Sequence, residues 1–262
     1  RPLLARQNFD PQRLDLVILG CVNVVADEMN PARVAALRLG LGEDMVAFTV
    51  QINCGSGMQS IDTAYRYIRD DSHDMILAGG AESLSHAPLV LRQSASEWFG
   101  KLAMAKGPLD QAKAMAGLKP EFFKPVIGLE RGLTDPVTDL GMGQTAEILA
   151  HRFDISRTMA DTYAMESHHR LAKAQKEGWL DNEVVPAFDR DGTVYEADDG
   201  VRPDSDLAGL AKPKPAFERP YGKVTAGNSS QITDGASWVI LASEEAVEEH
   251  GLKPIARIVD SE

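Results

Sequence analysis

Three short apolar runs lie near the start of the chain, separated by segments with helical periodicity. Residues 15–20 (DLVILG) and 74–80 (DMILAGG) are apolar runs that close on glycine, and residues 46–50 (VAFTV) form the run between them. Runs of this length and composition are typical of buried strands in a parallel sheet. The pattern therefore predicts three strands in the first part of the chain.

Two helices are expected between these strands. Asn30 is a predicted N-cap with Pro31 at the first helical position. A second helix is predicted to begin at Ser56 or Gly57. Its apolar positions follow the i, i+3, i+4, i+7 spacing and are Ile61, Ala64, Tyr65 and Ile68. The alternation of strand and helix predicts an α/β domain, with a parallel sheet covered by helices on both faces.

The pattern changes after about Pro88. Residues 89–211 show helical periodicity and many Pro, Gly and Met residues, so we expect a mostly helical insertion. One helix is predicted to start after Ser156 and to stop at Gly178. Its apolar side carries Met159, Tyr163, Leu171 and Ala174. The apolar run 238–242 indicates that the sheet then resumes. The predicted organisation is an α/β half made of residues 1–88 and 212–253, interrupted by the insertion 89–211.

Composition and charge narrow the classes of partner. The chain has 262 residues, of which 44% are hydrophobic and 25% charged, as in globular proteins. A formal net charge of −12 argues against nucleic acid and against anionic membrane surfaces, since both require a basic surface. No apolar run approaches the roughly 20 residues that span a bilayer. Two cysteines make no disulfide framework and no signal-like segment is present, so a cytoplasmic location is expected.

One cysteine occupies a position suited to chemistry. In the stretch VQINCGSGMQS, Cys54 follows a predicted strand and precedes a predicted helix. The N–H groups and the positive dipole end at a helix start stabilise a thiolate, and the flanking glycines leave room for a substrate. A free cysteine is also commonly just a small buried hydrophobe. Both interpretations remain open for Cys54, whereas Cys21 has no such context and is expected to be structural.

Three ordered blocks resemble the thiolase family. They are residues 53–58 (NCGSGM), residues 77–83 (LAGGAES), and residues 225–230 (TAGNSS) followed by 233–236 (TDGA). The likeness covers nearly the whole chain. It implies a thiolase-like layered α/β fold: an N-terminal half with a parallel or mixed sheet between helices, and a large inserted helical loop domain. Residues 143–147, 200–203, 214–217 and 220–222 look most similar to the thiolase subunits of trifunctional fatty-acid β-oxidation complexes.

The resemblance also implies a reaction. In thiolases a cysteine thiolate takes the acyl group of a 3-ketoacyl-CoA, acetyl-CoA leaves, and free CoA removes the acyl chain; synthesis reverses these steps. By resemblance Cys54 is the nucleophile of an acetyl-CoA C-acyltransferase. No covalently bound cofactor and no metal are expected, and coenzyme A or acyl-CoA is the substrate.

The resemblance assigns the insertion and the block after it to CoA binding. The matching positions are Met142, Arg202, Ala216, Phe217, Ala226, Gly227, Ser230 and Ile232. A guanidinium such as that of Arg202 stacks on adenine or pairs with phosphate. Gly141 stands where many relatives have a histidine, and Gln51 stands where many have an asparagine. These departures bear on CoA affinity and chain-length preference.

The remaining catalytic groups of the family are a histidine in a Gly-His-Pro block, an asparagine and a second cysteine. None of these blocks occurs in this sequence. Residues 254–262 resemble the first strand of the family's second half. The chain is therefore interpreted as a thiolase interrupted at both ends, with the C-terminal half missing.

Other features suggest surfaces. The adjacent His168 and His169 point about 100° apart on a helix, so they are expected to be a surface pair and not a metal site. The apolar stretch 118–129, with Phe122 and Phe123, is either an interaction surface or buried against the domain. By resemblance we expect a homodimer or tetramer, with a hydratase/dehydrogenase subunit as a candidate further partner.

Three functions follow from these observations. The first is a CoA-dependent thiolase. The second is a non-catalytic CoA-binding or subunit-interaction protein, and the third is a hydrolase that uses Cys54 with one of the six histidines. The hydrolase is the weakest, because no histidine has a motif context.

Overall fold

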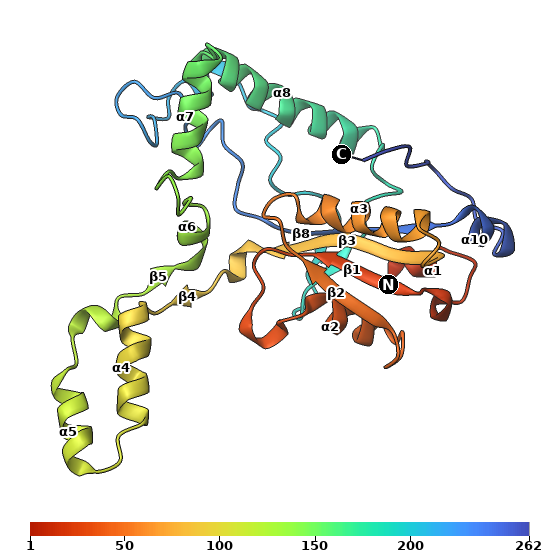
Figure 1. The fold of residues 1–262 in the computed structure, drawn as a ribbon. Helices are drawn as coiled ribbons and strands as arrows, with labels where there is room; N and C mark the ends of the chain where they lie inside the picture. The colour runs from red at the N-terminus through yellow and green to blue at the C-terminus, as the bar shows by residue number, and fades with distance from the viewer. Residues whose placement is uncertain (262) are drawn as a thin grey trace. The chain divides into compact units, whose positions relative to one another are not determined.

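The computed structural model describes residues 1–261 and shows two compact units (Figure 1). Unit 1 combines Arg1–Val90 with the chain from Ile232 onward, and unit 2 is Leu91–Gln231. Unit 1 carries the sheet, and unit 2 is mostly helical. Within the described residues, no helix is long and apolar enough to cross a lipid bilayer.

Unit 1 is built on a four-stranded mixed sheet with the order β2-β1-β3-β8. The strands are β1 (Leu16–Gly20), β2 (Val46–Val50), β3 (Met75–Ser83) and β8 (Asp234–Ala242). β1 is parallel to both β2 and β3, whereas β8 runs antiparallel to β3. All four predicted strands are confirmed; β3 continues to Ser83, and β8 begins at Asp234 because its first residues pair with the end of β3.

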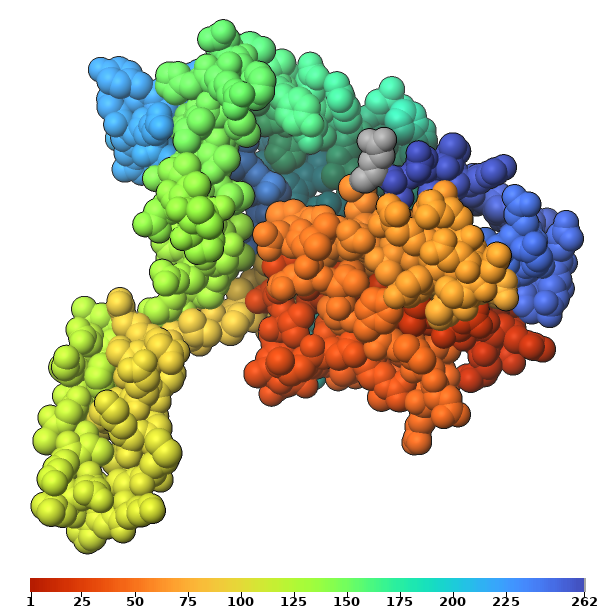
Figure 2. Space-filling model, viewed as in Figure 1, coloured from red at the N-terminus to blue at the C-terminus, as the bar shows by residue number. Residues whose placement is uncertain are grey.

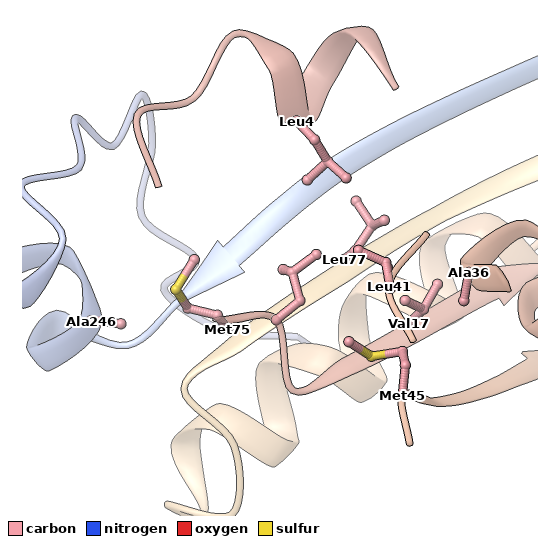
Figure 3. Close-up of a cluster of buried hydrophobic side chains, with 9 residues drawn as sticks. Leu4, Val17, Ala36, Leu41, Met45, Met75, Leu77 and Ala246 are labelled. Atoms are coloured by element: carbon pink, nitrogen blue, oxygen red, sulfur yellow. The ribbon is translucent and has the colours of Figure 1, made fainter. Parts of the chain in front are cut away.

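Helices cover both faces of this sheet, as predicted. The main helices are α2 (Pro31–Leu39) and α3 (Ser56–Arg69). Alternate residues of each strand face opposite sides. Val17 and Leu77 pack with Ala36 of α2, on the face that α1 (Pro2–Ala5) and α10 (Glu244–Glu249) also join (Figure 3). Ile18 and Ile76 pack with Ala64 of α3 on the other face. Burial on both sides explains why these strands are continuous apolar runs.

The expected helix ends in unit 1 are present. The Asn30 side chain accepts a hydrogen bond from the Arg33 N–H at 3.2 Å, and Pro31 is the first helical residue. Gly40 ends α2 with a left-handed φ of 85°, which glycine adopts without strain. The short elements of this unit are the 3-10 helices η1 (Pro11–Arg13), η2 (Ala26–Glu28) and η3 (Leu84–His86), and the strand β4 (Leu89–Val90).

Unit 2 begins with a helical hairpin formed by α4 (Gln93–Ala103) and α5 (Pro108–Ala116), which pack side by side (Figure 2). The buried Trp98 indole donates a hydrogen bond to the Ala114 carbonyl at 2.8 Å. Phe122, in the 3-10 helix η4 (Pro120–Phe123), is buried against Trp98, whereas Phe123 is 56% exposed. The apolar stretch 118–129 is thus partly core of this hairpin region and partly surface.

The remaining elements of unit 2 are mainly helices. They are β5 (Val126–Ile127), α6 (Gly128–Gly132), α7 (Met142–Arg152), α8 (Arg157–Lys176), β6 (Ala187–Phe188), β7 (Val194–Tyr195) and α9 (Leu207–Leu210). The unit extends past the predicted boundary at Ala211 to Gln231. The reason is that side chains of α7 and α8 bind the backbone and side chains of residues 223–228.

The long helix α8 has the predicted ends, and its apolar side is only partly covered. The Ser156 hydroxyl accepts from the Met159 N–H at 3.1 Å, and Gly178 follows the helix with a φ of 71°. However, Met159 is 57% and Tyr163 72% exposed. Leu171 and Ala174, on the same apolar side, are half-buried, and the only buried residue among those described in α8 is Asp161, which binds Asn228.

Candidate active site

Cys54 lies at the corner between β2 and α3 and is exposed to solvent. The corner is shaped by Asn53, whose φ of 54° is in the left-handed region that asparagine tolerates. The Ser56 hydroxyl ties the corner together: it accepts from the Ile52 N–H at 2.9 Å and donates to the Asn53 carbonyl at 2.6 Å. Cys54 is therefore held in a fixed turn with its side chain accessible.

The start of α3 sits closely on the end of β1 and on the middle of β3. A Cβ placed on Gly20, the last residue of β1, would lie 2.3 Å from the Ser56 carbonyl carbon and oxygen. A Cβ on Gly80 of β3 would lie 3.2 Å from the Gly57 Cα. The buried Ser60 hydroxyl lies 2.7 Å from the carbonyls of both Gly57 and Gly79. Glycine at these two strand positions allows the helix to begin directly beside β1 and β3.

The first turn of α3 presents donors next to Cys54. The amide N–H groups of Gly57 and Met58 have no hydrogen-bond partner among the described residues. Free N–H groups and the helix dipole favour negative charge at this point. Across residues 1–261, no hydrogen bond joins Cys54 to a histidine, as a cysteine hydrolase would require.

Cys21 has the opposite environment. It is 8% exposed and packs with Leu19 and Ala32, while its sulfur lies 3.9 Å from the Glu82 carboxylate. Burial, followed by the neighbouring Glu82 charge, raises the pKa of Cys21 from 9.0 to about 11. A thiol with this pKa stays protonated and unreactive near neutral pH. The prediction that Cys21 is structural is confirmed by its burial.

The predicted CoA-binding residues fall in unit 2, except for Ile232, which belongs to unit 1. Met142 begins α7 and is 51% exposed, and Phe217 is 49% exposed. A Cβ on Gly143 would lie 1.9 Å from the Phe217 ring, so the ring rests on the backbone beside Met142. These two apolar positions therefore share one surface. Ile232 is 66% exposed.

The other predicted positions lie on exposed loops that are tied to one another. They are Arg202, Ala216, Ala226, Gly227 and Ser230, of which all but Gly227 are exposed. The Ala216 N–H donates to the Val224 carbonyl at 2.9 Å, and the Gln231 amide donates to the Gly200 carbonyl at 2.9 Å. These bonds connect the segments around Arg202, Phe217 and Ser230.

The adjacent histidines of α8 have a role that the sequence did not reveal. The Arg202 N–H donates to His168 Nδ1 at 3.3 Å, and His169 Nε2 lies 2.8 Å from the Ser205 carbonyl. His168 and His169 therefore attach the loop that carries Arg202 to α8. Two further side chains missed by the sequence analysis are Glu147 and Asp161, which are buried under the loop 222–230.

Comparison with known proteins identifies the family. The profile of the family "Thiolase, N-terminal domain" matches residues 1–245. The chain belongs to the thiolase family. A curated relative from Staphylococcus epidermidis, named "Probable acetyl-CoA acyltransferase", is 36% identical over 265 residues, which is 100% of this chain and 62% of the relative. A Staphylococcus aureus relative of the same name is 35% identical over 97% of this chain and 61% of its own length.

Solved thiolase structures have the same fold. The crystal structure of the Bacillus anthracis acetyl-CoA acetyltransferase aligns with a TM-score of 0.82 and 33% identity, covering 97% of this chain and 60% of that protein. Human mitochondrial 3-ketoacyl-CoA thiolase in complex with CoA aligns with a TM-score of 0.81 and 33% identity, covering 96% and 58%. The thiolase fold is thus confirmed, and this chain spans about three fifths of the length of these thiolases.

Proposed function

We propose that the protein is a thiolase-type acyltransferase that uses Cys54 as its acyl carrier. The observation that carries this proposal is an exposed cysteine fixed at the start of α3, in a chain of the thiolase family. Attack on a carbonyl requires the thiolate form of a cysteine, and the corner between β2 and α3 leaves Cys54 exposed to a substrate. Cys21 does not compete, because it is buried and its pKa is raised.

The proposed reaction proceeds in two transfers. The Cys54 thiolate attacks the 3-keto carbon of a 3-ketoacyl-CoA, and the bond between carbons 2 and 3 breaks. The electron pair of that bond leaves on acetyl-CoA, which takes up a proton. The CoA thiol, losing its proton, then attacks the acyl-cysteine and leaves as the shortened acyl-CoA, while Cys54 regains its thiolate. Splitting the cleavage in this way replaces one difficult step with two easier ones.

The exposed loops of unit 2 are the proposed CoA surface. Met142 and Phe217 offer apolar contacts, and Arg202 offers a guanidinium for adenine or phosphate. Coenzyme A acts here as substrate, with no resident cofactor proposed. We place the reaction in fatty-acid β-oxidation in the cytoplasm. We also propose a homodimer or tetramer, which a hydratase/dehydrogenase subunit can join.

The proposal is tested by trapping the acyl group. The whole gene product is incubated with acetyl-CoA, quenched with acid and mapped by peptide mass spectrometry. We expect one acetyl group on Cys54 in the wild type, none in Cys54→Ser, and an unchanged label in Cys21→Ser. An acetyl group that persists in Cys54→Ser would contradict the proposed nucleophile. Binding of CoA without any acyl transfer or thiolysis would instead support the non-catalytic CoA-binding alternative.

A further inference from the structure

Two carboxylates are buried under the loop formed by residues 222–230. Glu147 of α7 is 1% exposed and Asp161 of α8 is 3% exposed. Removing a carboxylate from water is costly unless hydrogen bonds compensate. The hydrogen-bond partners of Glu147 and Asp161 therefore indicate the structural role of these side chains.

Glu147 receives its hydrogen bonds from the loop backbone. The Lys223 N–H lies 2.9 and 2.8 Å from its two oxygens, and the Val224 N–H lies 2.9 Å from Oε1. Gly222 fits against the same carboxylate, because a Cβ there would lie 2.6 Å from Oε1. Glu147 thus fixes the position of residues 222–224 relative to α7.

Asp161 holds the next part of the loop through Asn228. The Asn228 amide donates to Asp161 Oδ1 at 2.9 Å and to the Lys223 carbonyl at 2.9 Å. Its carbonyl oxygen accepts from the Thr225 N–H at 2.8 Å. Arg157 pairs with Asp161 at 2.8 Å and compensates its charge. Asn228 is therefore the connection between the loop and the second carboxylate.

Hydrogen bonds within the loop 222–230 also fix its shape. The Thr225 hydroxyl, fully buried, accepts from the N–H groups of Gly227 and Asn228 at 3.2 and 3.3 Å. The Ser229 hydroxyl donates to the Thr225 carbonyl at 2.6 Å. Residues 222–225 form no regular secondary structure, so the path of this loop depends on side-chain hydrogen bonds. Ala226, Gly227 and Ser230 are carried by the segment that these bonds hold.

We propose that Glu147 and Asp161 are positioning residues that hold the loop 222–230 in the shape required to bind CoA. This inference rests on the proposed function, because it takes CoA as the ligand of the loop. Neither carboxylate contacts the ligand surface, since both are buried and are occupied by loop donors. Their effect on the reaction is therefore expected in the affinity for CoA, with little effect once CoA saturates the enzyme.

The test compares Glu147→Gln and Asn228→Ala with the wild type in the whole gene product. Glu147→Gln replaces one accepting oxygen with a donor that faces the Lys223 N–H. Asn228→Ala disconnects the loop and leaves the Arg157–Asp161 pair in place; circular dichroism checks that the variant is folded. We expect each variant to weaken CoA binding in calorimetry by about tenfold, since a hydrogen bond to a charged group contributes on the order of that factor. KM for CoA rises by a similar factor, and kcat changes far less.

The matched control is Glu166→Gln, which removes an exposed carboxylate of α8 that pairs with Arg170. It is expected to leave CoA binding unchanged. Hydrogen exchange is measured in parallel and is expected to rise in residues 223–230 of both test variants, with the rest of unit 2 unaffected.

The outcomes separate the two proposals. A wild type that binds CoA, together with both variants binding it equally well, overturns the positioning role and leaves the proposed function intact. A fall in kcat with an unchanged KM also overturns the positioning role. A wild type that does not bind CoA at all counts against the proposed function and removes this inference with it.

Discussion

At the scale of single residues, the two cysteines differ in what surrounds the sulfur. Cys54 lies exposed beside unpaired amide N–H groups, whereas Cys21 is buried against a carboxylate. Thiol-alkylating reagents detect this difference between the two cysteines, because they react with the thiolate.

We predict that iodoacetamide alkylates Cys54 and spares Cys21 in the folded protein. The rise of the Cys21 pKa from 9.0 to about 11 leaves about 100-fold less thiolate than an ordinary cysteine has at the same pH. Burial reduces its rate further. Peptide mass mapping after a timed exposure measures both sites. Alkylation in urea is the control and should modify both cysteines, while similar rates in the folded state would contradict the prediction.

At the scale of elements, the position of Cys54 depends on how closely α3 approaches β1. Gly20 allows this approach because it has no side chain. A substitution at Gly20 is therefore expected to disturb the corner that holds Cys54, although Gly20 has no reactive side chain.

We predict that Gly20→Ala lowers the free energy of unfolding by about 1–3 kcal/mol, the usual range for an overpacked site. The new methyl group collides with the Ser56 backbone, which cannot move without shifting the start of α3. Gly235→Ala is the control, since a Cβ at that position of β8 meets nothing within 4 Å. Urea unfolding followed by circular dichroism compares the two. Equal stability of both variants would show that this contact is not tight.

The strands of unit 1 and several helix ends in both units could be predicted from the sequence because their signals are local. Apolar runs marked the strands, and Asn30, Ser156 and Gly178 marked helix ends by side-chain and backbone chemistry that needs no distant partner. The exposed side of α8 could not be predicted. Met159 and Tyr163 continue the apolar spacing of α8 but are exposed, whereas Asp161 is buried and binds Asn228.

At the scale of the whole molecule, the chain crosses from unit 1 to unit 2 after Val90 and returns at Ile232. Asp234, just after the return, binds the segment just before the departure. It accepts from the Ser85 N–H at 2.9 Å and from the Ser85 and Ser83 hydroxyls at 2.5 and 3.2 Å. These hydrogen bonds, those from Ser85 first, hold the pKa of Asp234 below its ordinary value of 3.8.

We predict that Asp234 stabilises unit 1 at neutral pH and loses this effect in acid. A carboxyl whose pKa is lowered in the folded state contributes stability above its unfolded value, and the contribution disappears as the pH falls through the folded value. Asp234→Asn should therefore unfold at lower urea than the wild type at neutral pH, and the difference should shrink below pH 3.8. Asp44→Asn, at an exposed position of unit 1, is the control. A difference that persists unchanged in acid would contradict this account.

Only part of the candidate site could be predicted from the sequence. Cys54 and the exposed CoA positions come from recognisable blocks, and their catalytic and binding roles stay predictions. Glu147, Asp161, His168 and His169 act through hydrogen bonds to residues far along the chain. Such partners are brought together only by folding, so the spacing of residues along the sequence does not predict them.

The contact between Gly143 and Phe217 makes these two positions interdependent in any redesign of the protein. A methyl group on residue 143 would occupy the space of the Phe217 ring. A smaller side chain at position 217 would leave that space free. Enlarging one residue therefore requires shrinking the other. Libraries that vary the two codons jointly will retain folded members that single-site libraries discard.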